Sequence, residues 1–318
     1  MISSSTRTDW RRASRQRARS AGRSRVGTTT ESAGEERFVT TILAVQIVKT
    51  PDWQQTHERH VAEAFADGGE RRIKRTYVQL GELLEQAYGD DVAAAPLLSL
   101  PETVPVVTRL LDGIGGLLLD AGCGPNPEAA ISLTGQNRRL VILDIAVGTV
   151  RLARARAAAN GVDLLGVVGD VEALPFKADA FAGGLCDDTI EHLPHDALGV
   201  RELSRVLAVG GVMALATPNR RALSVLVRRS RDLLRGRRLE PRHYYAAGSH
   251  LREYTWPEFE RLVEPWMHVR GRAAVGWAGG WHQRLATVAT ARPPLRRFSR
   301  MVVLAVERAH PQDPKPAV

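Results

Sequence analysis

Five short apolar runs, most of them ending at an aspartate, constrain the fold of this 318-residue chain more than any other feature. They read LLLD (117–120), LVILD (140–144), LLGVVGD (164–170), AGGLCD (182–187) and VMALATP (212–218). Helical stretches are expected between them, at 127–134, 149–160 and 197–207. Apolar strands that alternate with amphipathic helices are typical of a parallel sheet covered on both faces. The pattern predicts an α/β fold, with two further strands at 268–277 and 300–309.

The chain before the first run divides into two predicted parts. Residues 1–36 are rich in Arg and Ser and almost free of apolar residues, which predicts a disordered tail. Residues 37–105 are expected to form an N-terminal helical segment, because apolar residues in 52–88 recur at helical spacing. The ligand-binding domain is then 106–318, with an insertion at 220–256 after the fifth strand. We expect neither a membrane-spanning helix nor a secretory signal.

The chain has a net charge of +9, and its excess of positive charge lies in two segments. Residues 1–30 and 220–242 each have a net charge of +7, which leaves −5 for the rest of the chain. A basic tail could contact nucleic acid or anionic lipid, or be dispensable, but the acidic body makes a nucleic-acid partner unlikely. The two cysteines, Cys123 and Cys186, have neither a disulfide pattern nor zinc-ligand spacing, which is consistent with a reducing cytoplasm.

Aspartates end four of the predicted strands: Asp120, Asp144, Asp170 and Asp187. The carboxyl ends of parallel strands meet at one sheet edge, where ligands bind. Each aspartate alone could be a helix cap or a solvated turn, but together with the glycine-containing turn at 122–124 they predict a ligand site. A carboxylate at Asp120 would repel a pyrophosphate and suits a ligand with a positive charge. Asp144 stands at the position where an acidic residue accepts hydrogen bonds from the two hydroxyls of a ribose.

The motifs LLLDAGCGP, VILD, GDVEALPF, CDDTIEHL and ELSRVLAVGGVMALATPNR occur in this order over residues 110–220. In this order they resemble the class I S-adenosylmethionine-dependent methyltransferases, of the methyltransferase type 11 or quinone O-methyltransferase kind. The resemblance implies a Rossmann-like, mostly parallel seven-stranded sheet with helices on both faces, an N-terminal helical addition and a lid insertion. It implies S-adenosylmethionine as the cofactor.

The resemblance also implies roles for individual residues. Asp170 should meet the adenine amino group, the Val171 backbone N–H should meet a ring nitrogen, and Ile145 should flank the adenine with Leu174. Asn126 replaces the usual third glycine, and asparagine tolerates a left-handed backbone. The predicted cofactor residues are Asp120, Gly122, Cys123, Gly124, Asp144, Ile145, Asp170, Val171 and Asp187.

Methyl transfer from a sulfonium needs alignment of the reactants, and a base if the acceptor is a hydroxyl. His192, just past the fourth strand, is the predicted base, with Glu191 beside it as the second catalytic residue. Asp188, Glu191 and His192 are also similar to a pattern that holds a divalent cation in some relatives. A similar run occurs in relatives without a known metal, so we do not favour Mg²⁺ or another metal here.

The insertion suggests how an acceptor is bound. Residues 220–242 form a basic amphipathic stretch, which could lie on an anionic membrane or pack over the site with its arginines in solvent. The expected acceptor contacts are His243, Tyr244, Tyr245, His250 and Tyr254. The favoured function is O-methylation of a small molecule: a secondary metabolite, a quinone-like lipid or a glycan precursor. The alternatives are an RNA methyltransferase and a non-catalytic cofactor-binding partner subunit.

Overall fold

The computed structural model of the chain describes residues 70–94, 102–135, 137–236, 250–275 and 295–309. All of them belong to one compact unit, Lys49–Val318. The predicted disordered tail 1–36 lies outside the described residues, as does the start of the predicted helical segment.

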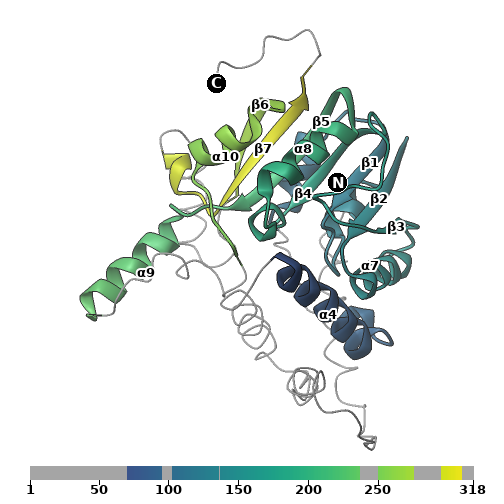
Figure 1. Ribbon diagram of the computed structural model, residues 1–318, viewed down its shortest axis with the longest axis horizontal. Helices are drawn as coiled ribbons and strands as arrows, with labels where there is room; N and C mark the ends of the chain where they lie inside the picture. Colours follow the sequence, from purple (N-terminus) through teal and green to yellow (C-terminus); the bar gives the residue numbers. More distant parts are fainter. Residues whose placement is uncertain (1–69, 95–101, 136, 237–249, 276–294, 310–318) are drawn as a thin grey trace, which may run out of the picture. The chain divides into compact units, whose positions relative to one another are not determined.

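A seven-stranded sheet runs through this unit (Figure 1). Its strands lie in the order β3-β2-β1-β4-β5-β7-β6. The first five are parallel, whereas β7 is antiparallel to both of its neighbours. The bounds are β1 Gly116–Ala121, β2 Arg138–Asp144, β3 Leu165–Val168, β4 Phe181–Asp187, β5 Leu207–Pro218, β6 Met267–Val275 and β7 Met301–Arg308. The seven predicted strands and the Rossmann-like fold class are confirmed, and the strand order reverses between β1 and β4.

Helices cover both faces of the sheet, as the apolar strands require. Leu118 and Leu119 are neighbours on β1, and their side chains point to opposite faces. Leu118 packs in a buried cluster with side chains of α5 (Val104–Leu110), α6 (Glu128–Leu133) and α7 (Val147–Ala159). Leu119 packs with side chains of α8 (Asp196–Val206) and α10 (Trp256–Val263). Each face of the sheet is therefore covered by apolar side chains of helices.

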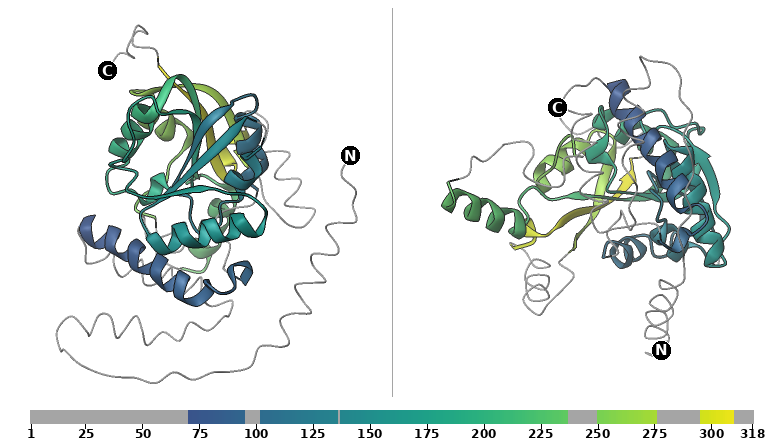
Figure 2. Two further views of the ribbon diagram at one scale, coloured as in Figure 1. Left: turned by 90° about the vertical axis from the view of Figure 1, so that its right-hand side faces the viewer. Right: turned by 90° about the horizontal axis from the view of Figure 1, so that it is seen from below.

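The N-terminal helix α4 (Glu70–Tyr88) lies against α7, and both views in Figure 2 show the two helices side by side. Leu84 and Tyr88 form a small buried cluster with Leu152 of α7. A side chain at Gly148 would overlap the Gly81 carbonyl, so the two helices approach backbone to backbone. Part of the helix predicted at 52–88 is thus confirmed, and it is fixed beside the carboxyl end of β2.

The predicted insertion 220–256 contains one described helix, and a second begins at its last residue. The helix α9 (Leu223–Leu234) follows β5, and residues 237–249 lie outside the described part of the chain. The helix α10 begins at a capping box, in which the Glu258 carboxylate accepts the backbone N–H of Thr255 at 2.8 Å. Among the described helices, none has both the length and the apolar character that crossing a membrane requires.

Candidate cofactor and acceptor site

The turn after β1 brings backbone close to the sheet edge. Gly122 and Gly124 have φ angles of 78° and 58°, in the left-handed region that glycine adopts without strain. A Cβ at Gly122 would overlap the side chain of Thr189, so only glycine allows the turn to approach the segment after β4. At Gly124 no described atom lies within 4 Å of where a Cβ would stand. Gly122 thus allows close packing against Thr189, whereas Gly124 borders open space.

Asn126 stands in place of the usual third glycine, and it is not among the residues of the described chain with a positive φ. The turn therefore does not use the tolerance of asparagine for a left-handed backbone. Gly122 and Gly124 already make the reversal of chain direction. The Asn126 carbonyl instead accepts the N–H of Glu128 at 2.9 Å, and its side chain is buried at the entrance to α6.

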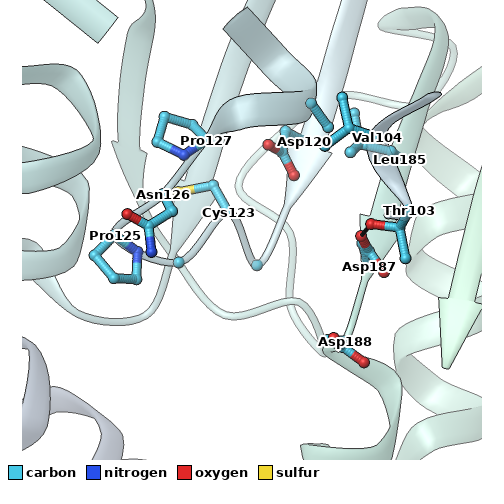
Figure 3. A pocket seen from close by; sticks show the side chains of 13 residues that line it. Thr103, Val104, Asp120, Cys123, Pro125, Asn126, Pro127, Leu185, Asp187 and Asp188 are labelled. Carbon is cyan, nitrogen blue, oxygen red and sulfur yellow. Dashed lines mark hydrogen bonds between the residues drawn. The ribbon is translucent and has the colours of Figure 1, made fainter. Parts of the chain in front are cut away.

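A pocket opens between this turn and the end of β4 (Figure 3). It encloses about 540 Å³ of empty space, counted to its open mouth. Five predicted cofactor residues line it: Asp120, Gly122, Cys123, Gly124 and Asp187. Asp188 lines it too, together with residues that our sequence reasoning did not assign to the site: Thr103, Val104, Pro125, Asn126, Pro127, Ala129 and Leu185. Thr103 and Val104 come from the start of α5, and no local motif pointed to them.

Two buried carboxyl groups set the electrostatics of the pocket. Burial raises the pKa of Asp120 to about 8, and the nearby charges of Asp187 and Asp144 contribute to this shift. Burial also raises the pKa of Asp187, whose Oδ2 accepts the hydroxyl of Thr103 at 2.5 Å. Asp187 Oδ1 is buried and has no hydrogen-bond partner among the described residues. The pocket therefore suits a ligand that brings a positive charge and N–H donors.

Asp144 ends β2 and is held by backbone groups on both sides. Its Oδ1 accepts the N–H of Ala146 at 3.0 Å, and its Oδ2 accepts the N–H of Gly124 at 3.2 Å. Burial raises its pKa to about 6, against the effect of these hydrogen bonds, which favour the charged form. The carboxylate is thus fixed next to the glycine turn, with lone pairs left for the two hydroxyls of a ribose. Ile145 follows it directly.

Asp170 lies beyond β3 with a partner that the sequence did not reveal. Lys74 of α4 places its Nζ 2.8 Å from Asp170 Oδ2 and 2.6 Å from the buried Glu172. These hydrogen bonds raise the pKa of the Lys74 ammonium against the opposing effect of burial. Asp170 Oδ1 accepts the N–H of Glu172 at 2.9 Å, and the side chain of Val171 is buried. An adenine amino group at Asp170 would share this carboxylate with Lys74.

The segment after β4 brings Asp188, Glu191 and His192 to the same edge. Glu191 is fully buried, and Thr217 donates to its Oε2 at 3.0 Å. Burial and the adjacent Asp188 charge raise the pKa of Glu191 well above its ordinary value, and a hydrogen bond from Glu191 favours the charged form of Asp188. Glu191 therefore holds the proton of this pair, and a protonated carboxyl is poorly suited to act as a base.

Two imidazoles lie beside Glu191. The rings of His192 and His250 have centroids 4.9 Å apart and an interplanar angle of 73°. The hydroxyl of Tyr77 on α4 lies 2.7 Å from His192 Nδ1, and Glu253 Oε1 lies 3.1 Å from His250 Nδ1. Burial lowers the pKa of His250 to about 4. This arrangement joins three segments that are far apart in the sequence.

This cluster and one other could in principle hold a metal ion. Ligand atoms of Glu191, His192 and His250 lie within 4.8 Å of one another, so His250 takes the place that we gave to Asp188. Two imidazoles and a protonated carboxyl are a poor set for Mg²⁺, which prefers oxygen ligands. The second group, Glu70, Glu172 and His195, contains the two carboxylates that Lys74 already neutralises. The donor sets thus do not favour magnesium.

The five predicted acceptor contacts do not lie together in the described part of the chain. His243, Tyr244 and Tyr245 lie outside the described residues. His250 lies beside His192 and Glu191. Tyr254 is buried in the main hydrophobic cluster and donates its hydroxyl to Asp196 at 2.7 Å, which gives it a packing role away from an acceptor.

Comparisons with known proteins agree with this geometry. Residues 119–215 match a family model described as a methyltransferase domain. A ubiquinone biosynthesis O-methyltransferase of Xanthomonas oryzae pv. oryzae is 30% identical over 127 residues, or 39% of this chain and 53% of that protein. A 27-O-demethylrifamycin SV methyltransferase of Amycolatopsis mediterranei is 32% identical over 146 residues, or 42% of this chain and 51% of that protein. The chain spans only about half the length of these relatives.

A chloroplastic 2-methyl-6-phytyl-1,4-hydroquinone methyltransferase 1 of Oryza sativa subsp. japonica is 37% identical over 82 residues, which are 26% of this chain and 24% of that protein. Among solved structures, the [4+2]-cyclase SpnF superposes with a TM-score of 0.51 at 15% identity, covering 74% of this chain and 97% of that one. At this identity the likeness concerns the fold alone, and a fold does not fix a reaction.

Proposed function

We propose that this chain, a member of the class I S-adenosylmethionine-dependent methyltransferases, uses that cofactor to methylate an oxygen atom of a small molecule. The observation that most strongly supports the proposal is the pocket at Asp120 and Asp187, two buried carboxyl groups beside an open glycine turn. When bound, S-adenosylmethionine supplies an activated methyl group on a sulfonium.

The chain's own residues would bind and orient this cofactor. Asp120 and Asp187 offer negative charge and a buried acceptor oxygen to its amino group. Asp144 offers its remaining lone pairs to the ribose hydroxyls, and Gly124 leaves space for the ligand to approach the backbone. Asp170, Val171 and Ile145 are proposed to contact the adenine. The residues after β4 are proposed to face the reacting end, where His192 and Glu191 are our sequence-based catalytic candidates.

The acceptor is proposed to be a hydroxyl of a small, lipid-like or secondary-metabolite molecule. Relatives that share the matched region are named for O-methylation in ubiquinone biosynthesis and of a rifamycin. A lipid-like substrate would be reached from a membrane surface, whereas an exclusively polar substrate would not. The helix α9 offers a surface for such a membrane contact. Its side chains Val227, Leu233 and Leu234 are 60%, 59% and 89% exposed.

We extend the proposal to a peripheral contact of residues 220–242 with anionic membrane in the cytoplasm. These residues combine the exposed apolar side chains of α9 with a net charge of +7. The double variant V227D/L234D should lose co-sedimentation with phosphatidylcholine vesicles that contain phosphatidylglycerol. The control V168D changes a similarly exposed valine, on β3, and should bind as the wild type does. Equal binding by V227D/L234D and wild type would contradict this contact.

The function is tested with methyl-labelled S-adenosylmethionine and a lysate of the source organism. The products are separated into organic-soluble, small polar, RNA and protein fractions. Label in the organic-soluble fraction is the expected result. Label in RNA would contradict the proposal, and binding of S-adenosylhomocysteine without label in any fraction would favour a non-catalytic subunit.

A further inference from the structure

Asp120 and Asp187 point to the face of the sheet that α5 covers. Asp120 pairs with Leu185 of β4, and Asp187 stands two positions further along that strand, so the three side chains share one face. On this face Leu185 packs in the buried cluster that contains Val107 of α5. The start of α5 also lines the pocket, and Figure 3 shows Thr103 next to Asp187.

The two carboxyl groups have no counter-ion in the described part of the chain. The Asp120 side chain is buried, and no described residue forms a hydrogen bond or an ion pair with it. Asp187 Oδ1 is buried and also has no hydrogen-bond partner. The charged groups that act on Asp187 are acidic: Asp188, which follows it in the chain, and Asp120 on β1. A ligand with a positive charge would compensate this cluster.

Thr103 contacts this cluster through its side chain. The residue is fully buried, and its hydroxyl donates to Asp187 Oδ2 at 2.5 Å, across 84 positions of the sequence. Threonine at the start of a helix usually accepts an N–H of the first turn with its hydroxyl. Thr103 makes no such capping bond, because Pro105 has no N–H and the N–H of Val106 donates to the Thr103 carbonyl at 2.9 Å. The hydroxyl therefore serves Asp187 and not its own helix.

The contact fixes the carboxyl group of Asp187. Its Oδ2 is held by Thr103, which leaves Oδ1 for a ligand in the pocket. A group that is already oriented loses less conformational entropy when a ligand binds. The position of α5 does not depend on this hydrogen bond, since Val107 and Leu111 are fully buried in the cluster beneath the helix. Removal of the Thr103 hydroxyl should therefore release Asp187 and leave α5 in place.

We propose that Thr103 is a positioning residue of the cofactor site, which holds Asp187 so that its Oδ1 meets the amino group of S-adenosylmethionine. This inference rests on the cofactor part of the proposed function. It adds a residue that lies outside the region matched by the family model, residues 119–215. Thr103 acts through Asp187, so its effect should be confined to the amino-acid end of the cofactor.

The test measures the affinity of the full chain for two ligands by calorimetry. Thr103→Val keeps the shape of the side chain and removes the hydroxyl. It should lower the affinity for S-adenosylhomocysteine about tenfold, the loss expected for one hydrogen bond to a charged group. The affinity for 5′-methylthioadenosine, which has the adenine and the ribose but no amino-acid portion, should stay unchanged. Thr103→Ser keeps the hydroxyl and should bind both ligands within about twofold of the wild type.

Thr108→Val is the matched control on the same helix. The Thr108 hydroxyl donates to the Val104 carbonyl at 2.9 Å, inside α5, and Thr108 does not line the pocket. This variant also loses one hydroxyl from α5, but its affinity for S-adenosylhomocysteine should match that of the wild type. Thermal unfolding should show one cooperative transition in each variant.

Three results would overturn the inference. The first is a wild-type affinity for S-adenosylhomocysteine in Thr103→Val. The second is an equal loss of affinity for both ligands, which would indicate a general distortion of the pocket. The third is a loss in Thr103→Ser as large as that in Thr103→Val.

Failure of the proposed function gives a different result. If the wild type does not bind S-adenosylhomocysteine, the proposed cofactor site fails and the inference fails with it. If the wild type binds this ligand but transfers no label in the lysate experiment, only the catalytic part of the proposal fails. A wild type that binds the ligand, together with a Thr103→Val variant that binds it equally well, removes the inference alone.

Discussion

The two halves of the site are built in different ways. The cofactor half consists of the turn after β1 and the ends of β2 and β4, so its residues are fixed by neighbouring strands of one sheet. The proposed acceptor half joins Tyr77 of α4, His192 after β4 and His250 of the predicted insertion. The first half uses backbone and carboxyl groups, and the second uses side chains on peripheral segments. Changes in one half should therefore leave the other intact.

The largest expected effect on the cofactor half comes from Asp144→Ala. Affinity for S-adenosylhomocysteine should fall about 100-fold, because two hydrogen bonds to a charged group contribute about 1.5 kcal/mol each. The circular dichroism spectrum should stay unchanged. Calorimetry measures the affinity, and Asp163→Asn, at a highly exposed aspartate after α7, is the matched control. Unchanged affinity in Asp144→Ala would remove Asp144 from the cofactor site.

The two glycines of the first turn should separate packing from binding. Gly122→Ala should lower the free energy of unfolding by about 2 kcal/mol or more, since its Cβ meets Thr189 and φ is positive. Gly124→Ala carries the positive-φ strain alone and should lower stability by only about 1 kcal/mol, while weakening cofactor binding. Urea unfolding and calorimetry measure the two quantities. Equal destabilisation by both variants would contradict this division.

The raised pKa of Asp120 predicts opposite pH dependences for binding and stability. A cationic ligand needs the carboxylate, so affinity for S-adenosylhomocysteine should rise between pH 6 and 8, by up to about tenfold per pH unit. The ligand-free protein binds this proton more tightly when folded than when unfolded. The Asp120 contribution to stability should therefore decrease as the pH rises from about 4 through 8. Asp120→Asn should flatten both trends, and a pH-independent affinity in the wild type would contradict the assignment.

The smallest effect should come from Lys74→Met, at the junction of the two halves. The buried Glu172 and the half-exposed Asp170 would lose their shared cation, which should cost about 1 kcal/mol of stability. Affinity for S-adenosylhomocysteine should fall only a few-fold, because Asp170 keeps its backbone contact. Thermal unfolding and calorimetry measure both, with Lys177→Met as the control. A loss as large as that of Asp144→Ala would place Lys74 itself in the cofactor site.

Much of the cofactor half could be predicted from the sequence because each element is local. Strands that are apolar on both faces must be covered on both faces, and the aspartates that end them must meet at one edge. Asp120, Gly122, Gly124 and Asp187 were found in this way. The sequence alone did not show whether the turn needs a left-handed backbone at Asn126, and the structure has positive φ at Gly122 and Gly124 but not at Asn126.

The proposed acceptor half could be predicted only in part. His192 could be named as a candidate because it lies directly after a strand. The contacts of Tyr77, Lys74 and Glu253 join distant segments, for which a single sequence has no local signal. The protonation of Glu191 likewise follows from complete burial beside Asp188, which is a property of the packed state.

The sequence by itself thus determined the sheet, its two covered faces and the edge where a charged ligand can bind, since hydrophobic periodicity and turn residues act over a few positions. Only the tertiary structure decided three further properties. His250 contacts the carboxyl group of Glu253, Asp170 forms an ion pair with Lys74, and Gly122 has no room for a side chain. These properties depend on distances between segments that are tens of residues apart, and burial then sets the charge that each group can carry.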